Sequence, residues 1–296
     1  RLNSKFVKSS NLKRLLNSKK IVRILETHSP ISAIIAENAK YKNKKVFREF
    51  DGFWSSSLTD STILGKPDNE ILSISERLNK ITQIMDVTTK PLIMDIDTGG
   101  KIEHLQSHII SLQNQGVAAV IMEDKKGLKK NSLFGTSVKQ YQEDPNKFVK
   151  KIKLIKNINI NRDFMIIARI ESLILGKSVN DALKRADLYI KNGVDGIMIH
   201  TAKNNPADIF KFSKKFKKNY TNVPLVAVPS SYSQIKEDQL IKYGFNIVIY
   251  ANQMFRATYP AMLKTALSIL KNTRSLEAEK NLMSIKSILN LISEKK

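Results

Sequence analysis

The sequence predicts an α/β fold, a (β/α)8 barrel of the TIM type with extra helices at its carboxyl-terminal end. Between residues 21 and 250, eight short apolar runs have the length of buried strands, and amphipathic stretches with helical spacing lie between them. Polar residues follow these runs, at the strand ends where such barrels carry their functional groups. The 296 residues fit one such domain. We expect a basic helix or extension over residues 1–20 and the barrel with its carboxyl-terminal helices over 21–296.

Lysine and arginine outnumber aspartate and glutamate by 50 to 27, which gives a net charge of +23. A potential of this size attracts phosphates, nucleic acids and anionic lipid. Eight of the basic residues, and no acidic residue, lie in the first 25 positions, but no aromatic-interleaved basic motif accompanies them. We therefore interpret the charge as lysine-rich, solvated helix faces and predict no specific nucleic-acid partner.

No apolar run approaches the roughly 18 residues of a membrane span, so we expect no membrane partner and a cytoplasmic location. The absence of cysteine excludes disulfides, thiolate metal sites and a cysteine nucleophile. The acid-free amino end has the composition of a transit peptide. However, Leu12, Leu15 and Leu16 have helical spacing and lead directly into the first apolar run, which favours a structural helix.

The first strand is expected over Ile21–Leu25. The lysine-rich stretch Ala39–Lys45 is typical of a loop, and the second strand is expected over Phe50–Trp54. The hydroxyl-rich stretch Ser55–Asp60 follows this strand. Hydroxyls and backbone N–H groups that cluster after a strand suit an oxyanion.

Two acidic strand ends follow. The strand at Leu92–Met94 leads into Asp95 and Asp97, which would point to one side about 7 Å apart if the chain stayed extended. The strand at Val117–Met122 ends at Glu123 and Asp124, where the chain is expected to meet solvent. Carboxylates without histidine or cysteine among them favour Mg²⁺, or Mn²⁺, over Zn²⁺.

The segment after Met122 reads E-D-K-K-G-L-K-K-N-S and contains many cations and hydrogen-bond donors. We interpret it as a lid that folds over an anion. Four more strands complete the barrel and deliver polar residues at their ends: Phe164–Ala168 before Arg169 and Glu171, Gly196–Ile199 before His200, Leu225–Val228 before Ser230, and Ile247–Tyr250 before Asn252.

Taken alone, Arg169 is typical of a structural ion pair, here with Glu171, and His200 of a buried core histidine. Their positions on successive strands favour a functional role, because the planar guanidinium of arginine suits a phosphoryl group. Beyond the barrel, Ala261–Lys271 and Ser275–Ile292 are expected to be helical.

The motif E-D-K-x5-N-S, formed by Glu123, Asp124, Lys125, Asn131 and Ser132, resembles the signature of phosphoenolpyruvate mutases in the isocitrate lyase and phosphoenolpyruvate mutase superfamily. The stretches D-I-D-T-G-G, A-R-I-E-S, M-I-H and V-P-S-S-Y occur in that family's order. The resemblance extends roughly from residue 21 to residue 292. It implies a Mg²⁺-dependent enzyme that interconverts phosphoenolpyruvate and phosphonopyruvate by moving a phosphoryl group from oxygen to carbon, the first step of phosphonate biosynthesis.

The resemblance also implies roles for individual residues. Asp95 would bind the metal directly, with the other carboxylates of the metal site at Asp97, Glu123 and Asp68. The substrate would be framed by Trp54, Ser56, Ser57, Leu58 and Lys125. The phosphoryl group would be held by Asn131, Ser132, Arg169 and His200, with Lys129 adding charge as the lid closes. Many relatives carry glycine at the position of Ser57, where serine would be strained if φ were positive.

The resemblance further implies a homodimer or homotetramer in which the last barrel helix is exchanged, and a second enzyme that consumes phosphonopyruvate. The nearest alternative activity is phosphonopyruvate hydrolase, which usually has threonine at the position of Asn131. Carbon–carbon lyases of the superfamily use a lid cysteine, which this chain lacks. A decarboxylase of oxaloacetate type and a basic polyanion-binding protein without activity are the remaining alternatives.

Overall fold

The computed structural model describes residues 2–158 and 160–292. Arg1 and residues 293–296, at the outer ends of the two predicted domains, lie outside the described residues. The chain divides into two compact units, Arg1–Asn252 and Gln253–Lys296.

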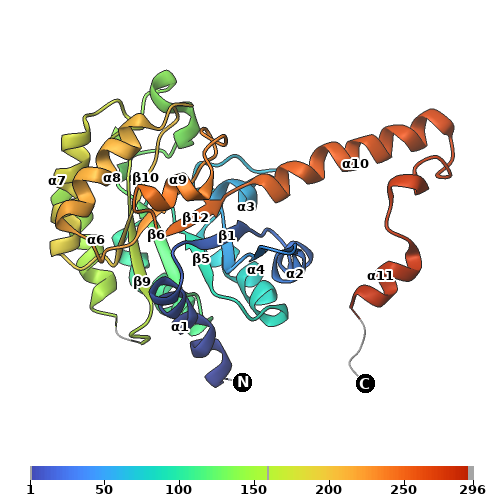
Figure 1. Ribbon diagram of the computed structural model, residues 1–296, viewed down its shortest axis with the longest axis horizontal. Helices are drawn as coiled ribbons and strands as arrows, with labels where there is room; N and C mark the ends of the chain where they lie inside the picture. The colour runs from blue at the N-terminus through green and yellow to red at the C-terminus, as the bar shows by residue number, and fades with distance from the viewer. Residues whose placement is uncertain (1, 159, 293–296) are drawn as a thin grey trace. The chain divides into compact units, whose positions relative to one another are not determined.

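The first unit is a closed barrel of eight parallel strands, which confirms the predicted fold class. Figure 1 shows the helices of this unit around the outside of the strands. The ring closes where β1 pairs with both β12 and β4, since Val22 lies opposite Ile247 and Ile24 opposite Gly52. In ring order, the strands are β1 (Val22–Glu26), β12 (Ile247–Tyr250), β11 (Leu225–Ala227), β10 (Gly196–Ile199), β9 (Met165–Ile170), β6 (Ala119–Glu123), β5 (Leu92–Asp95) and β4 (Gly52–Ser55).

Helices alternate with these strands, and several begin at capping residues that the sequence supplies. Ser73 and Glu76 form a capping box at the start of α4, and Asp144 caps α6 just before Pro145. The helices of this unit are α1 (Leu2–Ser18), α2 (Pro30–Asn38), α3 (Ser57–Ile63), α4 (Ile74–Val87), α5 (Ile102–Asn114), α6 (Pro145–Lys156), α7 (Val179–Lys191), α8 (Ala207–Asn219) and α9 (Glu237–Lys242).

The interior of the barrel is filled by apolar side chains from the strands, so it is a packed core and not a channel. Leu12 of α1 is fully buried in this cluster, and Leu15 and Leu16 pack against it. The amino-terminal helix predicted from the leucine spacing is therefore part of the barrel core.

One stretch predicted as a loop is a short hairpin. Strand β2 (Lys40–Lys42) pairs antiparallel with β3 (Phe47–Glu49), so the loop prediction for residues 39–45 was wrong in part. The Asn43 carboxamide oxygen accepts hydrogen bonds from the backbone N–H groups of Lys45 and Val46 and shapes the turn. The hairpin is largely exposed, and its lysines therefore gave it the composition of a loop.

The second unit contains α10 (Gln253–Asn272), a 3₁₀ turn η2 (Glu279–Asn281) and α11 (Ile285–Leu291). Helix α10 begins before the predicted segment and continues through Pro260. The segment predicted over 275–292 is divided between the 3₁₀ turn and a shorter helix. Among the residues that the structure describes, no helix has both the length and the apolar character needed to cross a bilayer.

Candidate active site

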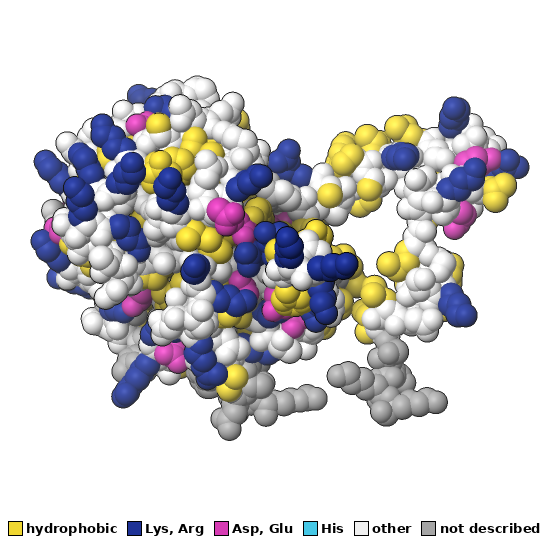
Figure 2. All heavy atoms as spheres, in the orientation of Figure 1, with side chains coloured by type: hydrophobic (Ala, Val, Ile, Leu, Met, Phe, Trp, Pro, Cys, Tyr) yellow, Lys and Arg dark blue, Asp and Glu magenta, His cyan; other side chains and the backbone are white. Residues whose placement is uncertain are grey.

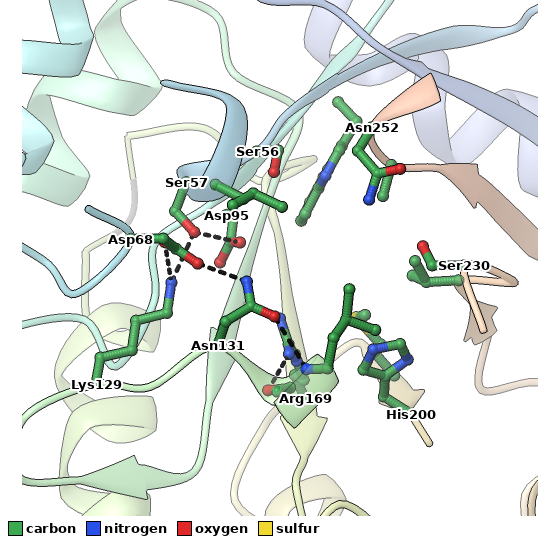
Figure 3. Close-up of a pocket in the computed structure, with 17 residues that line it drawn as sticks. Ser56, Ser57, Asp68, Asp95, Lys129, Asn131, Arg169, His200, Ser230 and Asn252 are labelled. Atoms are coloured by element: carbon green, nitrogen blue, oxygen red, sulfur yellow. Dashed lines mark hydrogen bonds and ion pairs between the residues drawn. The ribbon is translucent and has the colours of Figure 1, made fainter. Parts of the chain in front are cut away.

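A cavity of about 60 Å³ lies at the carboxyl ends of the barrel strands (Figure 3). This space holds a few water molecules or one small organic anion. Eleven of the fourteen predicted site residues line it: Trp54, Ser56, Ser57, Leu58, Asp68, Asp95, Lys129, Asn131, Ser132, Arg169 and His200. The other three, Asp97, Glu123 and Lys125, are buried immediately behind lining residues and contact them.

The serine-rich stretch after β4 forms the start of α3. Ser56 is the N-cap residue, but its side chain makes no capping hydrogen bond, and it faces the cavity. Ser57 does not have a positive φ, so serine is not strained at this position. Its hydroxyl donates to Asp95 Oδ2 at 3.0 Å and accepts from Lys129 Nζ at 2.8 Å. Ser57 therefore joins the carboxylates to the lid through a side chain that glycine lacks.

The carboxylates after β5 differ from the extended arrangement that the sequence suggested. The strand ends at Asp95, and Asp97 has a φ of 54°, so the two side chains do not follow strand alternation. The Asp97 backbone N–H donates to Asp95 Oδ1 at 3.0 Å. Burial, opposed by Lys129 and reinforced by Asp95, raises the pKa of Asp97 to about 6. Asp97 is therefore ionised at neutral pH.

Glu123 and Asp124 are buried, 1% and 0% exposed, so the expectation that they meet solvent was wrong. The physical reason is that the following segment folds back over the end of β6. Burial raises the pKa of Glu123 to about 8, although Arg169 and Lys125 oppose the shift. Neither Glu123 carboxylate oxygen has a hydrogen-bond partner.

Lys129 extends from the lid into the carboxylate group. Its ammonium nitrogen lies 2.8 Å from Asp68 Oδ1 and also contacts Asp97 Oδ1. Burial alone would lower the pKa of Lys129, but the surrounding carboxylates outweigh burial and raise it. Within the described parts of the chain, no three histidine or acidic side chains form a group that could hold a metal ion. The four predicted metal ligands, Asp68, Asp95, Asp97 and Glu123, all lie near the ammonium group of Lys129.

Across the cavity from Asp68 and Asp95, Figure 3 shows His200, Ser230 and Asn252. Burial, reinforced by the charge of Arg169, lowers the pKa of His200 to about 3, so its imidazole is neutral. Its Nδ1 atom is buried without a hydrogen-bond partner. A neutral imidazole can donate one hydrogen bond and accept another, and the donor fits the oxygen atoms of a bound anion.

Arg169, on β9, forms the structural ion pair considered from the sequence and also lines the cavity. Its Nε donates to Glu171 Oε1, and its Nη2 donates to Ser132 Oγ at 2.6 Å. Although burial opposes ionisation, Arg169 and Lys125 hold the pKa of Glu171 at about 2. The ion pair with Glu171 fixes the guanidinium while another edge of it lines the cavity.

The predicted lid is an ordered segment with two anchors. Strands β7 (Lys125–Lys126) and β8 (Tyr141–Gln142) pair antiparallel, and a 3₁₀ segment η1 (Ser132–Ser137) lies between them. Asn131 caps η1 through its carboxamide oxygen, and its Nδ2 donates to Asp68 Oδ2 at 2.7 Å. Both nitrogen-bearing side chains of the lid that line the cavity, Lys129 and Asn131, thus bind Asp68.

Asp124 has a structural role that the sequence did not reveal. Its buried carboxylate accepts hydrogen bonds from Tyr189 OH at 2.8 Å, Arg185 Nη1 at 3.1 Å and Gln142 Nε2 at 2.9 Å. Gln142 belongs to β8, so Asp124 fastens the far end of the lid to α7. No local pattern predicts this network, because its members are up to 65 positions apart.

Ser230 and Asn252 line the cavity but were given no role from the sequence. The available signal was their position after β11 and β12, the last two barrel strands in the sequence. The functional groups of such a barrel lie at the carboxyl ends of its strands.

The side chains around Lys129 are of the chemical type that binds magnesium, although in this structure they do not form a group that could hold a metal ion. Mg²⁺ prefers carboxylate oxygens and retains several waters, and Asp95, Asp97, Asp68 and Glu123 offer only hard oxygen donors. Glu123 supplies two buried oxygens without a hydrogen bond among the described residues, and its ion pairs with Arg169 and Lys125 are long, at 3.5 and 3.8 Å, so these oxygens retain capacity to bind a cation.

Comparisons with known proteins identify the family of the chain. The sequence model of the phosphoenolpyruvate phosphomutase family matches residues 12–270. A phosphoenolpyruvate phosphomutase of Tetrahymena pyriformis is 32% identical over 288 residues, which cover 97% of this chain and 92% of the relative.

Two solved structures are similar over nearly the whole chain. The crystal structure of a phosphoenolpyruvate phosphomutase from Streptomyces platensis subsp. rosaceus has a TM-score of 0.88 and 31% identity, with 96% of this chain and 94% of that chain covered. The crystal structure of a phosphonopyruvate hydrolase in complex with oxalate and Mg²⁺ has a TM-score of 0.85 at the same identity and coverage. Overall similarity therefore does not separate the two activities.

Proposed function

The chain belongs to the phosphoenolpyruvate phosphomutase family, and we propose that it is a phosphoenolpyruvate mutase, which interconverts phosphoenolpyruvate and phosphonopyruvate. The observation that carries the proposal is the position of Asn131. It lines the cavity beside Ser132 and Arg169, on a lid that covers the space where a phosphoryl group would migrate.

The reaction needs a phosphoryl group to leave the enol oxygen of phosphoenolpyruvate and bond to C3 of the same pyruvate unit. One P–O bond breaks, one P–C bond forms, and no water is consumed. Transfer of this kind demands positioning and charge neutralisation more than covalent catalysis. Arg169 would neutralise the phosphoryl oxygens, while Asn131, Ser132 and neutral His200 would donate hydrogen bonds to them.

The pyruvate part would lie against the other side of the cavity. Trp54 and Leu58 offer apolar walls, and the Ser56 side chain and the first backbone N–H groups of α3 offer hydrogen bonds to a carboxylate. Asp95, Asp97, Glu123 and Asp68 would hold Mg²⁺, or Mn²⁺, which supplies positive charge to the enolate oxygen and carboxylate when bound.

The lid would exclude water, which otherwise captures the migrating group and yields phosphate and pyruvate. Lys125, which is buried behind the cavity, would help to hold the lid in place. Its Nζ donates to the Lys130 carbonyl oxygen at 3.0 Å and to Ser132 Oγ. Asn131 favours the mutase over phosphonopyruvate hydrolase, which usually carries threonine at this position. The equal similarity to a hydrolase structure keeps hydrolysis as the second candidate.

We further propose that the chain forms a homodimer or homotetramer and that a second enzyme consumes the phosphonopyruvate. Exposed apolar residues on α10 and α11 support self-association, since they include Tyr259, Leu270 and Leu289, each at least 70% exposed.

Phosphorus NMR of the purified protein with Mg²⁺ and synthetic phosphonopyruvate tests the proposal. We expect the phosphonate resonance to be replaced by that of phosphoenolpyruvate. Asp95→Ala, purified identically, is the control, and it should retain the wild-type circular dichroism spectrum but give no product. Release of inorganic phosphate with pyruvate by the wild type, and not by the control, would establish the hydrolase instead.

A further inference from the structure

The ammonium group of Lys129 lies among the oxygen atoms proposed to hold the metal. It is 2.8 Å from both Asp68 Oδ1 and Ser57 Oγ, and it also contacts Asp97 Oδ1. Ser57 in turn donates to Asp95. The Lys129 side chain is only 4% exposed, so it lies fully within the site.

This position has an electrostatic reason. Several carboxylates brought together in a buried space repel one another unless a cation lies between them. Lys129 provides one positive charge, and each of its observed contacts is with an oxygen atom. A divalent cation would require the same carboxylate oxygens, and two cations cannot share them at these distances without strong repulsion.

Lys129 makes one of several contacts that hold the lid, alongside Asn131 with Asp68 and Lys125 with the Lys130 carbonyl oxygen. Between positions 126 and 130, Lys129 is buried, whereas Lys126, Gly127, Leu128 and Lys130 are exposed. Gly127 has a φ of 76° and no atoms within 4 Å of where a Cβ would lie, so the backbone there is loosely surrounded. Withdrawal of Lys129 would expose little apolar surface and would leave residues 126–129 without a buried side chain, while Lys125 still binds the Lys130 carbonyl oxygen.

We propose that Lys129 is an internal competitor of the divalent cation: it closes the lid over the metal-free carboxylates and must withdraw before the metal binds. This inference rests on the metal site of the proposed function. It predicts that the metal alone opens the lid around Lys129, and that closure over the loaded site requires substrate, whose negative charge then offers the lysine a new partner.

Metal affinity tests the competition directly. Binding of Mn²⁺ to the wild type, Lys129→Met and Lys130→Met would be measured by the loss of the free Mn²⁺ signal in electron paramagnetic resonance, without substrate. Lys130→Met removes the same charge from the next residue, whose side chain is exposed and has no carboxylate contact among the described interactions. Lys129→Met should bind Mn²⁺ at least about tenfold more tightly than the wild type, the factor expected when the closed lid is populated about nine-tenths of the time. Lys130→Met should change affinity by less than about twofold, as a screened surface charge does.

Equal affinities of Lys129→Met and Lys130→Met would overturn the competition while leaving the metal site intact. Absence of Mn²⁺ binding in all three proteins would overturn both this inference and the metal site of the proposed function.

Limited trypsin digestion of the wild type gives a readout that needs no variant. Cleavage after Lys126 and Lys130, identified by mass spectrometry, should be slow in the metal-free protein and at least about fivefold faster with saturating Mn²⁺, since the stretch 126–130 loses its one buried side chain when Lys129 withdraws. Mn²⁺ that leaves the cleavage rate in the lid unchanged, or lowers it, would show that the metal and Lys129 do not compete.

Discussion

His200 illustrates how burial decides the chemistry of one side chain in this site. It is 4% exposed and lies near Arg169, and both effects disfavour the imidazolium form. A neutral imidazole can approach an anionic phosphoryl group as a hydrogen-bond donor without a strong charge interaction. The cation that the phosphoryl group requires is supplied by Arg169, whose charge does not depend on pH in the working range.

The depressed pKa of His200 predicts a loss of stability in acid. The folded pKa is about 3 and the ordinary value is 6.5, so between these values the unfolded chain binds a proton that the folded chain does not. Stability from this group is therefore complete above pH 6.5 and declines as the pH falls, by about 2 kcal/mol between pH 7 and pH 5. In urea denaturation at the two pH values, His200→Gln should show a smaller loss than the wild type by about this amount.

The control for this prediction is His104→Gln, which removes an exposed histidine from α5. It should lose as much stability between pH 7 and pH 5 as the wild type. If His200→Gln behaves like this control, His200 is protonated in the folded protein and its assignment as a neutral donor is wrong.

At this scale, the sequence predicted which residues meet but not how they interact. Arg169 and His200 could be placed in the site because each follows a strand, and strand ends converge in a barrel. The burial of Glu123 and the position of Lys129 among the carboxylates could not be predicted. Both depend on how the lid folds back, which is determined by contacts such as Asp124 with Tyr189 that are distant in sequence.

At the scale of elements, the site depends on Arg77, which joins α4 to the ends of two strands. Its guanidinium donates to Asp60 Oδ2 at 2.7 Å, to the Ser55 carbonyl oxygen and to the Asp95 carbonyl oxygen. The side chains of Arg77 and Asp60 are each 1% exposed. This ion pair therefore holds the ends of β4 and β5, and the residues that follow them, in one arrangement.

Arg77→Met should destabilise the protein by about 3 kcal/mol, because it leaves buried carbonyl oxygens and part of the Asp60 charge without a donor. Lys80 also contacts Asp60, so the loss should be at the lower end of the range for broken buried ion pairs. The free energy of unfolding from urea denaturation is the measurement. Lys191→Met, which breaks an exposed pair with Asp187 on α7, should cost at most about 0.5 kcal/mol. Equal effects of the two variants would contradict this role of Arg77.

The strands were the most predictable elements, because eight buried apolar runs bounded by polar residues fit few other folds. The hairpin β2–β3 was missed, since exposed strands rich in lysine lack the alternating apolar pattern that marks a half-buried strand. The start of α10 was also missed. Pro260 suggested a helix boundary, whereas the structure keeps the helix continuous from Gln253.

At the scale of the whole molecule, charge and fold carry different information. On the face of the barrel in Figure 2, lysine and arginine side chains are spread among polar and apolar ones. This distribution favours solvated helix faces over one nucleic-acid-binding patch. The fold likewise supports both mutase and hydrolase activities in its relatives, so the assignment depends on the lid and not on the scaffold.

The second unit supports a prediction about assembly. On α10, Tyr259, Leu263 and Leu270 share one face, and they are 70%, 44% and 74% exposed. The opposite face lines a cavity with Ala278 and Leu282 of the same unit. A helix with apolar residues on both faces has one face available for another subunit, and burying these three side chains would contribute several kcal/mol at about 25 cal/mol per Å².

We therefore expect the wild type to have a mass of at least twice the 33.6 kDa of one chain in size-exclusion chromatography with light scattering. The double variant Leu263→Glu and Leu270→Glu should shift to a smaller species, because association would bury two carboxylates in an apolar contact. Lys271→Glu changes the net charge by the same two units on the same helix but lies outside the apolar face, and it should keep the wild-type mass. A wild type that elutes as a monomer, or a double variant that retains the wild-type mass, would show that this face of α10 does not join subunits.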